Sequence, residues 1–349
     1  MYSVTQVTES GTPVLGVALS NGQRRKGRCR RGVGTGPFVF PGSSCRRVAA
    51  SPTDAPMPSL IVIRMHNHVA LLTDYGLDDE FVGVLKSVIT DMAPHVRITD
   101  ITHGVPPFDV RWGSLALARA IQYVPAGVIV AEVDPGVGSS RKAVAIEVAG
   151  GNGVLLGPDN GLLSSAASMA GGAERAFLLT NTELHLEAPG TTFAGRDIFA
   201  PVAAFLCNGG ALEEVGEEVD IATLMPGLVP LPSTDSHATH GDGLRCEVTW
   251  VDHYGNCQLN VGPEDLSHLG PVLRVVVGDD VRSARVESHF AAIAEGAIGA
   301  VIDSYGMIAL AVDRGSAAQA LRLQAGDAVH LYAGEDGTTS PVTLRPAGH

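Results

Sequence analysis

The strongest constraint on the fold is a regular alternation of apolar runs and helix-like segments that begins at residue 68. Residues 68–74 (HVALLTD) predict a strand, and residues 79–94 carry apolar side chains at helical spacing. Two more strands, 96–104 and 127–138, flank a second predicted helix at 112–125. Because the strands are apolar at consecutive positions, we expect helices on both faces of a sheet. The sequence predicts an N-terminal three-layer α/β domain with a largely parallel sheet.

The pattern changes at a polar stretch without periodicity, which we interpret as an interdomain linker over residues 230–243. The N-terminal α/β domain then spans residues 67–229. Residues 244–349 form short apolar runs separated by Gly and Asp turns. They predict a smaller all-β C-terminal domain, either a barrel or a sandwich.

Charge is distributed unevenly along the chain. Residues 1–60 carry a balance of +6, and the net charge of −13 therefore leaves about −19 on the remainder. The basic segment RRKGRCRRG has no helical or strand period, so residues 1–66 are predicted to be a disordered basic extension. The acidic body argues against nucleic acid as a partner, since phosphate binding needs clustered Lys and Arg.

Further classes are excluded by cysteine usage and hydropathy. The five cysteines show no C-x-x-C spacing, so we predict neither a disulfide framework nor a metal site, and we expect a cytoplasmic protein. No apolar run reaches the roughly 18 residues of a membrane span, so no membrane association is predicted.

Polar and glycine-bearing segments follow three of the predicted strands, where ligands of α/β proteins bind. Asp74, the last residue of the first strand, could hold sugar hydroxyls. Asp134 and Arg141 lie seven residues apart across a glycine loop, and could form a structural ion pair or a site. His103 could belong to the site, or be a buried histidine with a structural role.

Four other polar residues have a plainer interpretation as helix caps. Asp78 and Asp79 precede the first predicted helix, and carboxylates are favoured at helix N-termini. Asn160 and Asp197 occupy capping positions in two loop-then-helix segments, GPDNGLLSSAA and TFAGRDIFAP.

Seven ordered motifs carry a resemblance to a known family: LLTDYG, DITHGVPPFDV, VDPGVGSSRK, GPDNGLL, TFAGRDIFAP, VDHYGN and DSYGMIALAV. Together they resemble, over residues 68–333, the S-adenosyl-L-methionine (SAM) hydroxide adenosyltransferase family, whose halide-using relatives are fluorinase and chlorinase. The resemblance implies that water attacks the ribose C5′ carbon of SAM, giving adenosine and L-methionine. It implies a homotrimer with SAM bound between two subunits, and no cofactor, because SAM is the substrate.

The resemblance also implies which residues bind the substrate. They come from both domains: Asp74, Phe108, Asn160, Phe193, Gly195, Asp252, Tyr254, Asn256, Ser304 and Arg314. By this resemblance Asp74 would hold the ribose diol, and Phe108 would pack near the ribose or the sulfonium.

In the C-terminal domain, the resemblance implies contacts at both ends of the ligand. Asn256 would bind adenine with help from Tyr254 and the backbone of Arg314. Asp252 would face the methionine ammonium group, and Ser304 would face its carboxylate.

The implied catalytic residues are Asp134, Arg141 and the residue at position 194. They resemble an Asp, Arg, His set that positions and deprotonates water, with Arg141 holding Asp134 through a bidentate pair. The family pattern reads F-H-G-R-D, whereas this chain has Ala194 in place of the histidine. Either the protein is an altered or weakened version, or another group such as His103 serves.

Two alternative functions follow from the same motifs. Ala194 favours a non-catalytic SAM or adenosine sensor, because this residue replaces the histidine of the family pattern. A SAM-dependent halogenase is disfavoured, because Asp134 stands where the halide enzymes resemble T-Y-P-A-T-G. The segment between Val148 and Gly157 is also too short for the fluorinase insertion.

Overall fold

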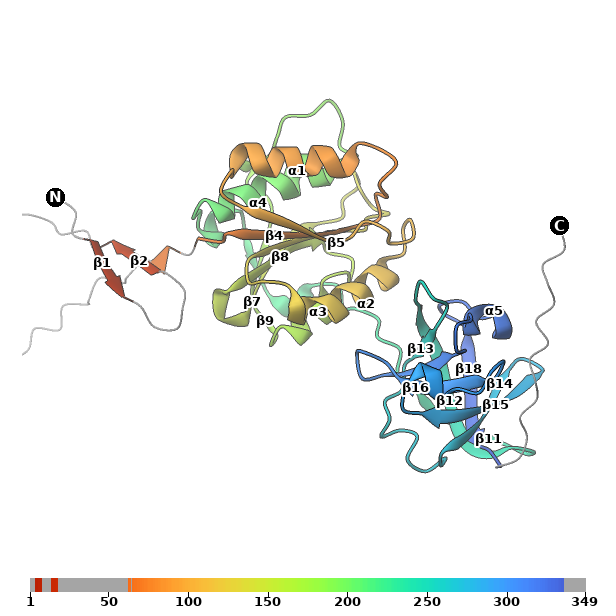
Figure 1. Ribbon diagram of the computed structural model, residues 1–349. Coiled ribbons are helices and arrows are strands. Elements are labelled where there is room, and N and C mark those ends of the chain that lie inside the picture. The colour runs from red at the N-terminus through yellow and green to blue at the C-terminus, as the bar shows by residue number, and fades with distance from the viewer. Residues whose placement is uncertain (1–3, 8–13, 18–61, 64, 336–349) are drawn as a thin grey trace, which may run out of the picture. The chain divides into compact units, whose positions relative to one another are not determined.

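The computed structural model describes residues 4–7, 14–17, 62–63 and 65–335 (Figure 1). The chain divides into two units, Met1–Met65 and His66–His349. In the first unit, three short strands form an antiparallel sheet: β1 (Val4–Val7), β2 (Val14–Val17) and β3 (Val62–Ile63). These strands differ from the disorder predicted for residues 1–66, and their Val-rich sequences are of the type that favours strands. The rest of that extension lies outside the described residues.

The second unit begins with a seven-stranded sheet in the order β10-β9-β7-β8-β6-β4-β5. Its strands are β4 (His68–Thr73), β5 (Arg97–Thr102), β6 (Val128–Glu132), β7 (Ala143–Val148), β8 (Gly153–Pro158), β9 (Ala173–Leu178) and β10 (Glu218–Val219). Strands β5, β4, β6 and β8 are parallel, while β7, β9 and β10 are antiparallel. The predicted largely parallel sheet is confirmed, with an antiparallel portion at one side.

Helices cover both faces of this sheet (Figure 1). They are α1 (Phe81–Met92), α2 (Val110–Ala120), α3 (Ser164–Met169) and α4 (Ala200–Cys207). Val69 and Leu71 of β4 pack in one core with residues of α1 and α4, and Ala70 and Leu72 pack in another with residues of α2 and α3. Successive residues of a strand point to opposite faces, so a strand apolar at every position needs two helical layers. The three-layer α/β domain is confirmed.

Three of the residues predicted to cap helices do not do so. They are Asp78 and Asp79 before α1, and Asp197 before α4. The residue that precedes α1 is Glu80, in an αR conformation and without a side-chain cap, while Asp78 and Asp79 lie exposed ahead of it. A capping side chain requires an extended backbone at that position. Asp197 lies inside a π-helical turn, Gly195–Phe199, and not at its start.

The C-terminal domain is a closed barrel, one of the two predicted forms. Its elements are β11 (Ser233–His237), β12 (Gly241–Val251), β13 (Cys257–Leu259), β14 (Val272–Val277), β15 (Asp280–Glu287), β16 (Ile298–Ile302), β17 (Ile308–Ala311), α5 (Ala317–Leu321) and β18 (Ala328–Ala333). The sheet order runs from β11 through β12, β13, β17, β16, β15 and β14 to β18, and β12 also pairs with β18. That last pairing closes the barrel around its own apolar core.

The segment expected to be a linker contains a strand. β11 pairs antiparallel with β12 from Ser233 opposite Arg245 to His237 opposite Gly241. Asp235 of this strand contacts His330 Nδ1 at 2.5 Å. Most of β11 is exposed, so its sequence shows no alternation of apolar and polar residues, and periodicity could not detect it.

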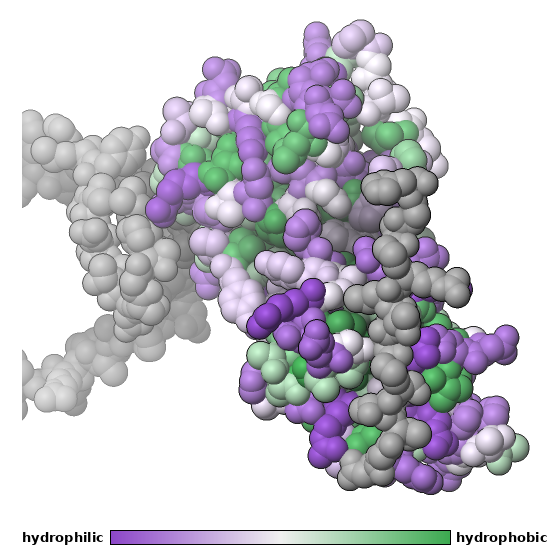
Figure 2. All heavy atoms as spheres, turned by 45° about the vertical axis from the view of Figure 1, so that its right-hand side comes forward, coloured by the Kyte–Doolittle hydropathy of each residue, from purple (hydrophilic) through white to green (hydrophobic). Residues whose placement is uncertain are grey.

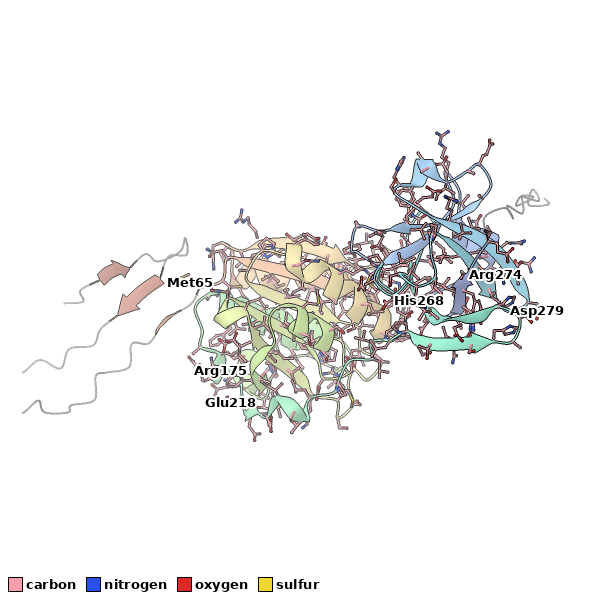
Figure 3. All side chains as sticks on the ribbon, turned by 90° about the horizontal axis from the view of Figure 1, so that it is seen from below. Met65, Arg175, Glu218, His268, Arg274 and Asp279 are labelled. Carbon is pink, nitrogen blue, oxygen red and sulfur yellow. The ribbon has the colours of Figure 1, made fainter. Side chains whose placement is uncertain are left out.

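The surface of this unit is predominantly polar with small apolar patches on the face drawn in Figure 2. Arg175 of β9, labelled in Figure 3, lies near one edge of the α/β sheet. It contacts Glu147 of β7 at 2.7 Å and also pairs with Glu213. Among the described helices, none is long and apolar enough to cross a membrane.

Candidate functional site

The carboxyl ends of β4 and β5 are joined through His103. Its Nδ1 lies 2.8 Å from the Thr73 hydroxyl, and its carbonyl oxygen accepts a hydrogen bond from Gly76 N at 2.8 Å. Its Nε2 lies 3.1 Å from Asp100 Oδ1, an ion-pair distance without hydrogen-bond geometry. The ring is buried and contacted at both nitrogens. These contacts favour the structural interpretation of His103 over a role as a base.

Asp134 and Arg141 form a buried ion pair directly after β6. Their side chains are 2% and 12% exposed, and Arg141 Nη2 contacts Asp134 Oδ2. Gly136 N donates to Asp134 Oδ1 at 3.0 Å, and Arg141 Nη1 donates to the carbonyl oxygen of Lys142 at 2.7 Å. The predicted bidentate geometry is wrong, because the second guanidinium nitrogen is taken by that carbonyl. The ion pair itself is present, at the carboxyl end of β6 where the sequence predicts it.

Asp74 holds the loop that carries Phe108. Its Oδ2 accepts a hydrogen bond from Phe108 N at 2.8 Å. Phe108 has a φ of +69°, in the left-handed region that a phenylalanine rarely adopts, and its side chain is 70% exposed. Backbone strain of this kind concentrates at binding sites. The two predicted ribose-side residues therefore lie together.

Asn160 connects the loop after β8 to the end of β6. Its Nδ2 donates to the carbonyl oxygen of Val133 at 2.9 Å, and its Oδ1 accepts from Leu162 N at 3.1 Å. The residue therefore positions the backbone immediately before Asp134.

The loop before α4 brings three predicted residues to the same region. The ring of Phe193 packs edge-on against Tyr75 and Phe81, with centroids 5.7 and 5.0 Å away. Ala194 is buried in the core beneath α1 and α4. A Cβ on Gly195 would collide with Glu132 Oε2 and with the Tyr75 hydroxyl, so only glycine fits this close approach.

Glu132 is a residue of this site that the sequence analysis missed. It is the last residue of β6 and is 2% exposed. Burial raises the pKa of Glu132 to about 7; the neighbouring Tyr75 hydroxyl opposes this rise, and the negative charge of Asp134 adds to it. The available signal was a single carboxyl group within the apolar run VIVAEV, since a buried strand seldom carries an acid.

In the C-terminal domain, the turn after β12 is organised by Asp252. Its Oδ1 accepts hydrogen bonds from Tyr254 N at 2.9 Å and Asn256 N at 2.8 Å, and its Oδ2 accepts from Asn256 Nδ2 at 2.7 Å. Gly255, with a φ of +85°, packs directly on Ser316 at the start of α5. This contact places the turn beside the loop that precedes α5.

The turn after β12 and the loop before α5 border a pocket of about 620 Å³ that is open to solvent. It is lined by Tyr254, Asn256, Phe290, Val312, Arg314 and Gly315. The three residues predicted to surround adenine thus lie together, and Arg314 has a φ of +52°. Phe290 was missed, because it follows β15 and no motif marks it. An aromatic ring with an amide and backbone groups suits a flat heterocyclic ligand.

Ser304 lies apart from this pocket. It sits in the turn after β16, which Asp303 organises by accepting from Tyr305 N at 2.8 Å and Met307 N at 3.0 Å. The register of β13 and β17 places this turn at the opposite end of the strand pair from the pocket. The structure does not bring Ser304 together with the adenine-side residues.

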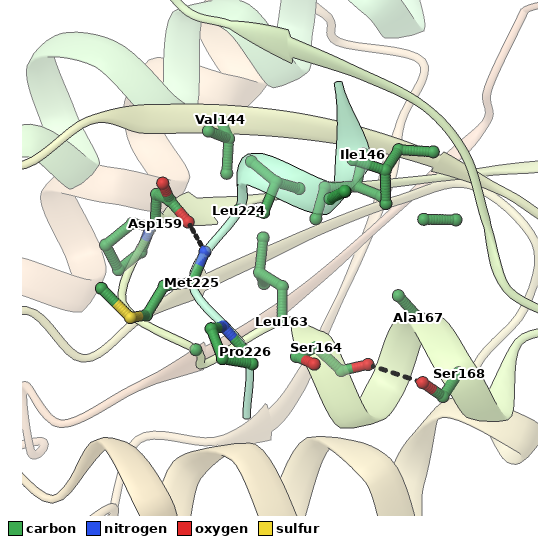
Figure 4. Close-up of a pocket in the computed structure, with 15 residues that line it drawn as sticks. Val144, Ile146, Asp159, Leu163, Ser164, Ala167, Ser168, Leu224, Met225 and Pro226 are labelled. Carbon is green, nitrogen blue, oxygen red and sulfur yellow. Dashed lines mark hydrogen bonds between the residues drawn. The ribbon is translucent and has the colours of Figure 1, made fainter. Parts of the chain in front are cut away.

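A separate pocket of about 340 Å³ lies between β7, α3 and the segment after β10 (Figure 4). Its lining is largely apolar, with Ile146, Leu163 and Leu224 among its residues. Asp159 accepts a hydrogen bond from Met225 N at 2.7 Å. Its acidic side chain thus holds the loop, and we place no chemistry there.

Together these features define a two-domain protein. An acid–arginine pair lies at the carboxyl ends of the strands of an α/β sheet, and an aromatic pocket lies on a β-barrel. Residues 69–216 match the family model of the SAM hydroxide adenosyltransferase N-terminal domain, and residues 246–330 match that of the C-terminal domain. The chain belongs to the SAM hydroxide adenosyltransferase family.

Individual relatives agree with this assignment. The chain is 43% identical to a protein of Salinispora tropica named (R)-S-adenosyl-L-methionine hydrolase, over 76% of this chain and 98% of the relative. It is 28% identical to a fluorinase of Nocardia brasiliensis, over 76% and 97% of the two chains. A crystal structure of an uncharacterized conserved protein from Thermotoga maritima superposes with a TM-score of 0.67 at 35% identity, over 76% and 99%.

Proposed function

We propose that this protein is an enzyme that hydrolyses SAM to adenosine and L-methionine. The observation that carries the proposal is the buried Asp134–Arg141 pair at the convergent strand ends of a chain in this family. The hydrolase name of the Salinispora relative supports water as the second reactant. Asp134 stands where the halide enzymes have a different motif, which supports water over a halide.

In the proposed reaction, the oxygen of water forms a bond to C5′ while the bond from C5′ to sulfur breaks. Its electron pair goes to sulfur, so the positive sulfonium becomes the neutral thioether of methionine. Asp134 accepts a hydrogen bond from the attacking water, which gives up one proton as its oxygen bonds to C5′, and Arg141 holds Asp134 in place. A buried, preorganised pair lowers the barrier because its dipoles need no rearrangement. The sulfonium is already a good leaving group, so we include no metal and no cofactor.

We assign the pocket around Tyr254, Asn256 and Arg314 to adenine, and Asp74 with Phe108 to the ribose side. The pocket is lined by residues of the C-terminal domain alone. Phe108 and Tyr254 are 70% and 76% exposed, which is unusual for aromatic rings that a ligand site uses. This exposure supports a homotrimer in which each site combines the N-terminal domain of one subunit with the C-terminal domain of another.

The proposal also covers partners and compartment. The acidic body supports small-molecule ligands and no nucleic acid as partner, and we expect no membrane association. Cys207, Cys246 and Cys257 are buried free thiols, which supports a reducing cytoplasm.

The test is incubation of the purified protein with SAM in water enriched in ¹⁸O, followed by chromatography and mass spectrometry. We expect adenosine and methionine in equal amounts, with the label at the 5′ hydroxyl of adenosine. Intact SAM released from the protein would support the sensor alternative instead. A 5′-halogenated nucleoside formed in chloride or fluoride would support the halogenase.

A further inference from the structure

Glu132 is a buried carboxyl group that neither the motifs nor the resemblance assigns to the reaction. Its Oε2 and the Tyr75 hydroxyl are both buried, and Tyr75 and the backbone of Gly195 are polar groups that lower the pKa of Glu132 there, although their contacts with Oε2 lack good hydrogen-bond geometry. Both atoms lie beside the backbone of Gly195. Burying a carboxyl group costs free energy, and Tyr75 and the backbone of Gly195 offset this cost only in part, because the pKa of Glu132 stays above its usual value. Its persistence in the core points to a use beyond packing.

The strand geometry directs Glu132 toward the position where the family has a histidine. Val128 and Val130 of β6 belong to the core that contains Ala194. Because side chains alternate along a strand, Glu132 points to the same face as these two valines. The next residue, Gly195, touches Glu132 directly. The chain therefore has an alanine where the family pattern has an imidazole, and a buried carboxyl group against the glycine that follows this alanine.

Glu132 is also coupled to the pair that the proposed reaction uses. It follows the same strand into Asp134, and the charges of Asp134 and Arg141 both act on it. Burial raises the pKa of Glu132 to about 7, so near neutral pH it can both accept and release a proton. A carboxyl of this kind beside a site is a candidate base on physical grounds.

We propose that Glu132 supplies the proton acceptor that the family's histidine would provide at position 194. This inference rests on the proposed hydrolysis of SAM. As the oxygen of water bonds to C5′ and the pair of electrons of the broken C5′–S bond goes to sulfur, the Glu132 carboxylate takes one proton from that water. Asp134 orients the water, and Glu132 returns the proton to solvent before the next turnover.

The first experiment compares the wild type with Glu132→Gln by steady-state kinetics and by SAM binding. We expect kcat to fall by about 10²- to 10⁴-fold, the usual contribution of a positioned base, with an unchanged dissociation constant for SAM. The wild-type kcat/KM should fall tenfold for each pH unit below an apparent pKa near 7, and Glu132→Gln should lose this acid limb. Glu147→Gln, a carboxyl of β7 that pairs with Arg175, is the matched control and should keep the wild-type rate and profile.

The second experiment adds the missing imidazole. Ala194→His in the Glu132→Gln background should restore a large part of the lost rate, because the histidine would act on the same water. Glu132→Asp should lose rate but keep the acid limb, whereas a purely structural glutamate would tolerate Gln better than the shorter Asp. Glu132→Asp also decides the matter if Glu132→Gln does not fold, because it keeps the carboxyl group in the site.

The outcomes separate the two proposals. A wild type that forms no adenosine from SAM would overturn the hydrolase function and this inference with it. A wild type that hydrolyses SAM, together with a Glu132→Gln variant that keeps its rate and its acid limb, would overturn only the role of Glu132.

Discussion

The Tyr75 hydroxyl and the Glu132 carboxyl share the space beside the Cα of Gly195, where a Cβ would collide with both. Gly195→Ala must displace both of these buried polar groups, so we expect a loss of about 1 to 3 kcal/mol in the free energy of unfolding and a lower kcat. Urea unfolding and SAM turnover measure the two effects. Gly83→Ala is the control: nothing lies within 4 Å of its added Cβ on α1, and a Gly to Ala change within a helix should stabilise by up to about 1 kcal/mol. Equal stability of the two variants would contradict the close packing at Gly195.

The Asp134–Arg141 pair predicts a loss of rate without a loss of affinity. Asp134→Asn keeps the shape of the side chain but weakens its hold on water, so kcat should fall by about 10²- to 10⁴-fold while SAM affinity stays constant. Arg141→Lys keeps the charge but cannot reach both Asp134 and the Lys142 carbonyl, and should be intermediate. Single-turnover kinetics with SAM checks both. An Asp134→Asn variant as fast as wild type would exclude this residue from the chemistry.

Asp252 has a structural role and a proposed ligand role, which two substitutions separate. Asp252→Ala removes three hydrogen bonds from the turn and should cost about 1 to 3 kcal/mol of stability. Asp252→Asn can keep the acceptor for Tyr254 N and Asn256 N, but it removes the charge and the acceptor for Asn256 Nδ2. If that charge faces the methionine ammonium, calorimetry should show SAM binding weakened about tenfold or more beyond any change in adenosine binding. Unaltered SAM affinity in Asp252→Asn would show that Asp252 stabilises the turn and does not bind the ligand.

The buried carboxyl of Glu132 predicts a dependence of stability on pH. Its pKa is about 7 in the folded protein and about 4.3 when unfolded, so between these values the folded state binds more protons. Stability is therefore lost as pH rises from about 4.5 to 7, by roughly 3 kcal/mol from this group. Glu132→Gln should lack this loss, so its stability relative to wild type should increase over that range. Chemical unfolding from pH 4.5 to 8 measures the difference, and parallel curves would contradict the raised pKa.

The proposed sharing of sites between subunits predicts complementation. Sedimentation should give about three subunits, and Asp134→Asn and Asn256→Ala place their defects in different domains. If each site uses both domains from different chains, mixed trimers of the two variants contain some intact sites, and activity should recover on mixing. Activity that stays at the level of the separate variants, or a stable monomer with full SAM affinity, would show that one chain contains the whole site.

The amino-acid sequence alone determined the layers of the fold and the general location of the site. Consecutive apolar residues in β4 and β6 required helices on both faces, and this is local information that any window of the chain contains. Polar residues that follow parallel strands lie together at the carboxyl ends of those strands, so the location of Asp74 and Asp134 could be predicted. Tyr254 and Asn256 could be predicted to lie together because they belong to one short motif, in which both backbone amides donate to the nearby Asp252.

Only the tertiary structure decided which side chains meet across long stretches of sequence. Glu132 and Gly195 lie 63 residues apart in the chain, yet they touch because β6 and the loop before α4 pack in one core. Phe290 joins Tyr254 and Arg314 because β17 pairs with both β16 and β13, and β11 forms because β12 offers it an edge, although its own residues show no period. Periodicity reports which face of an element is buried. The partner on that face is set by packing between distant segments, which a linear pattern does not contain.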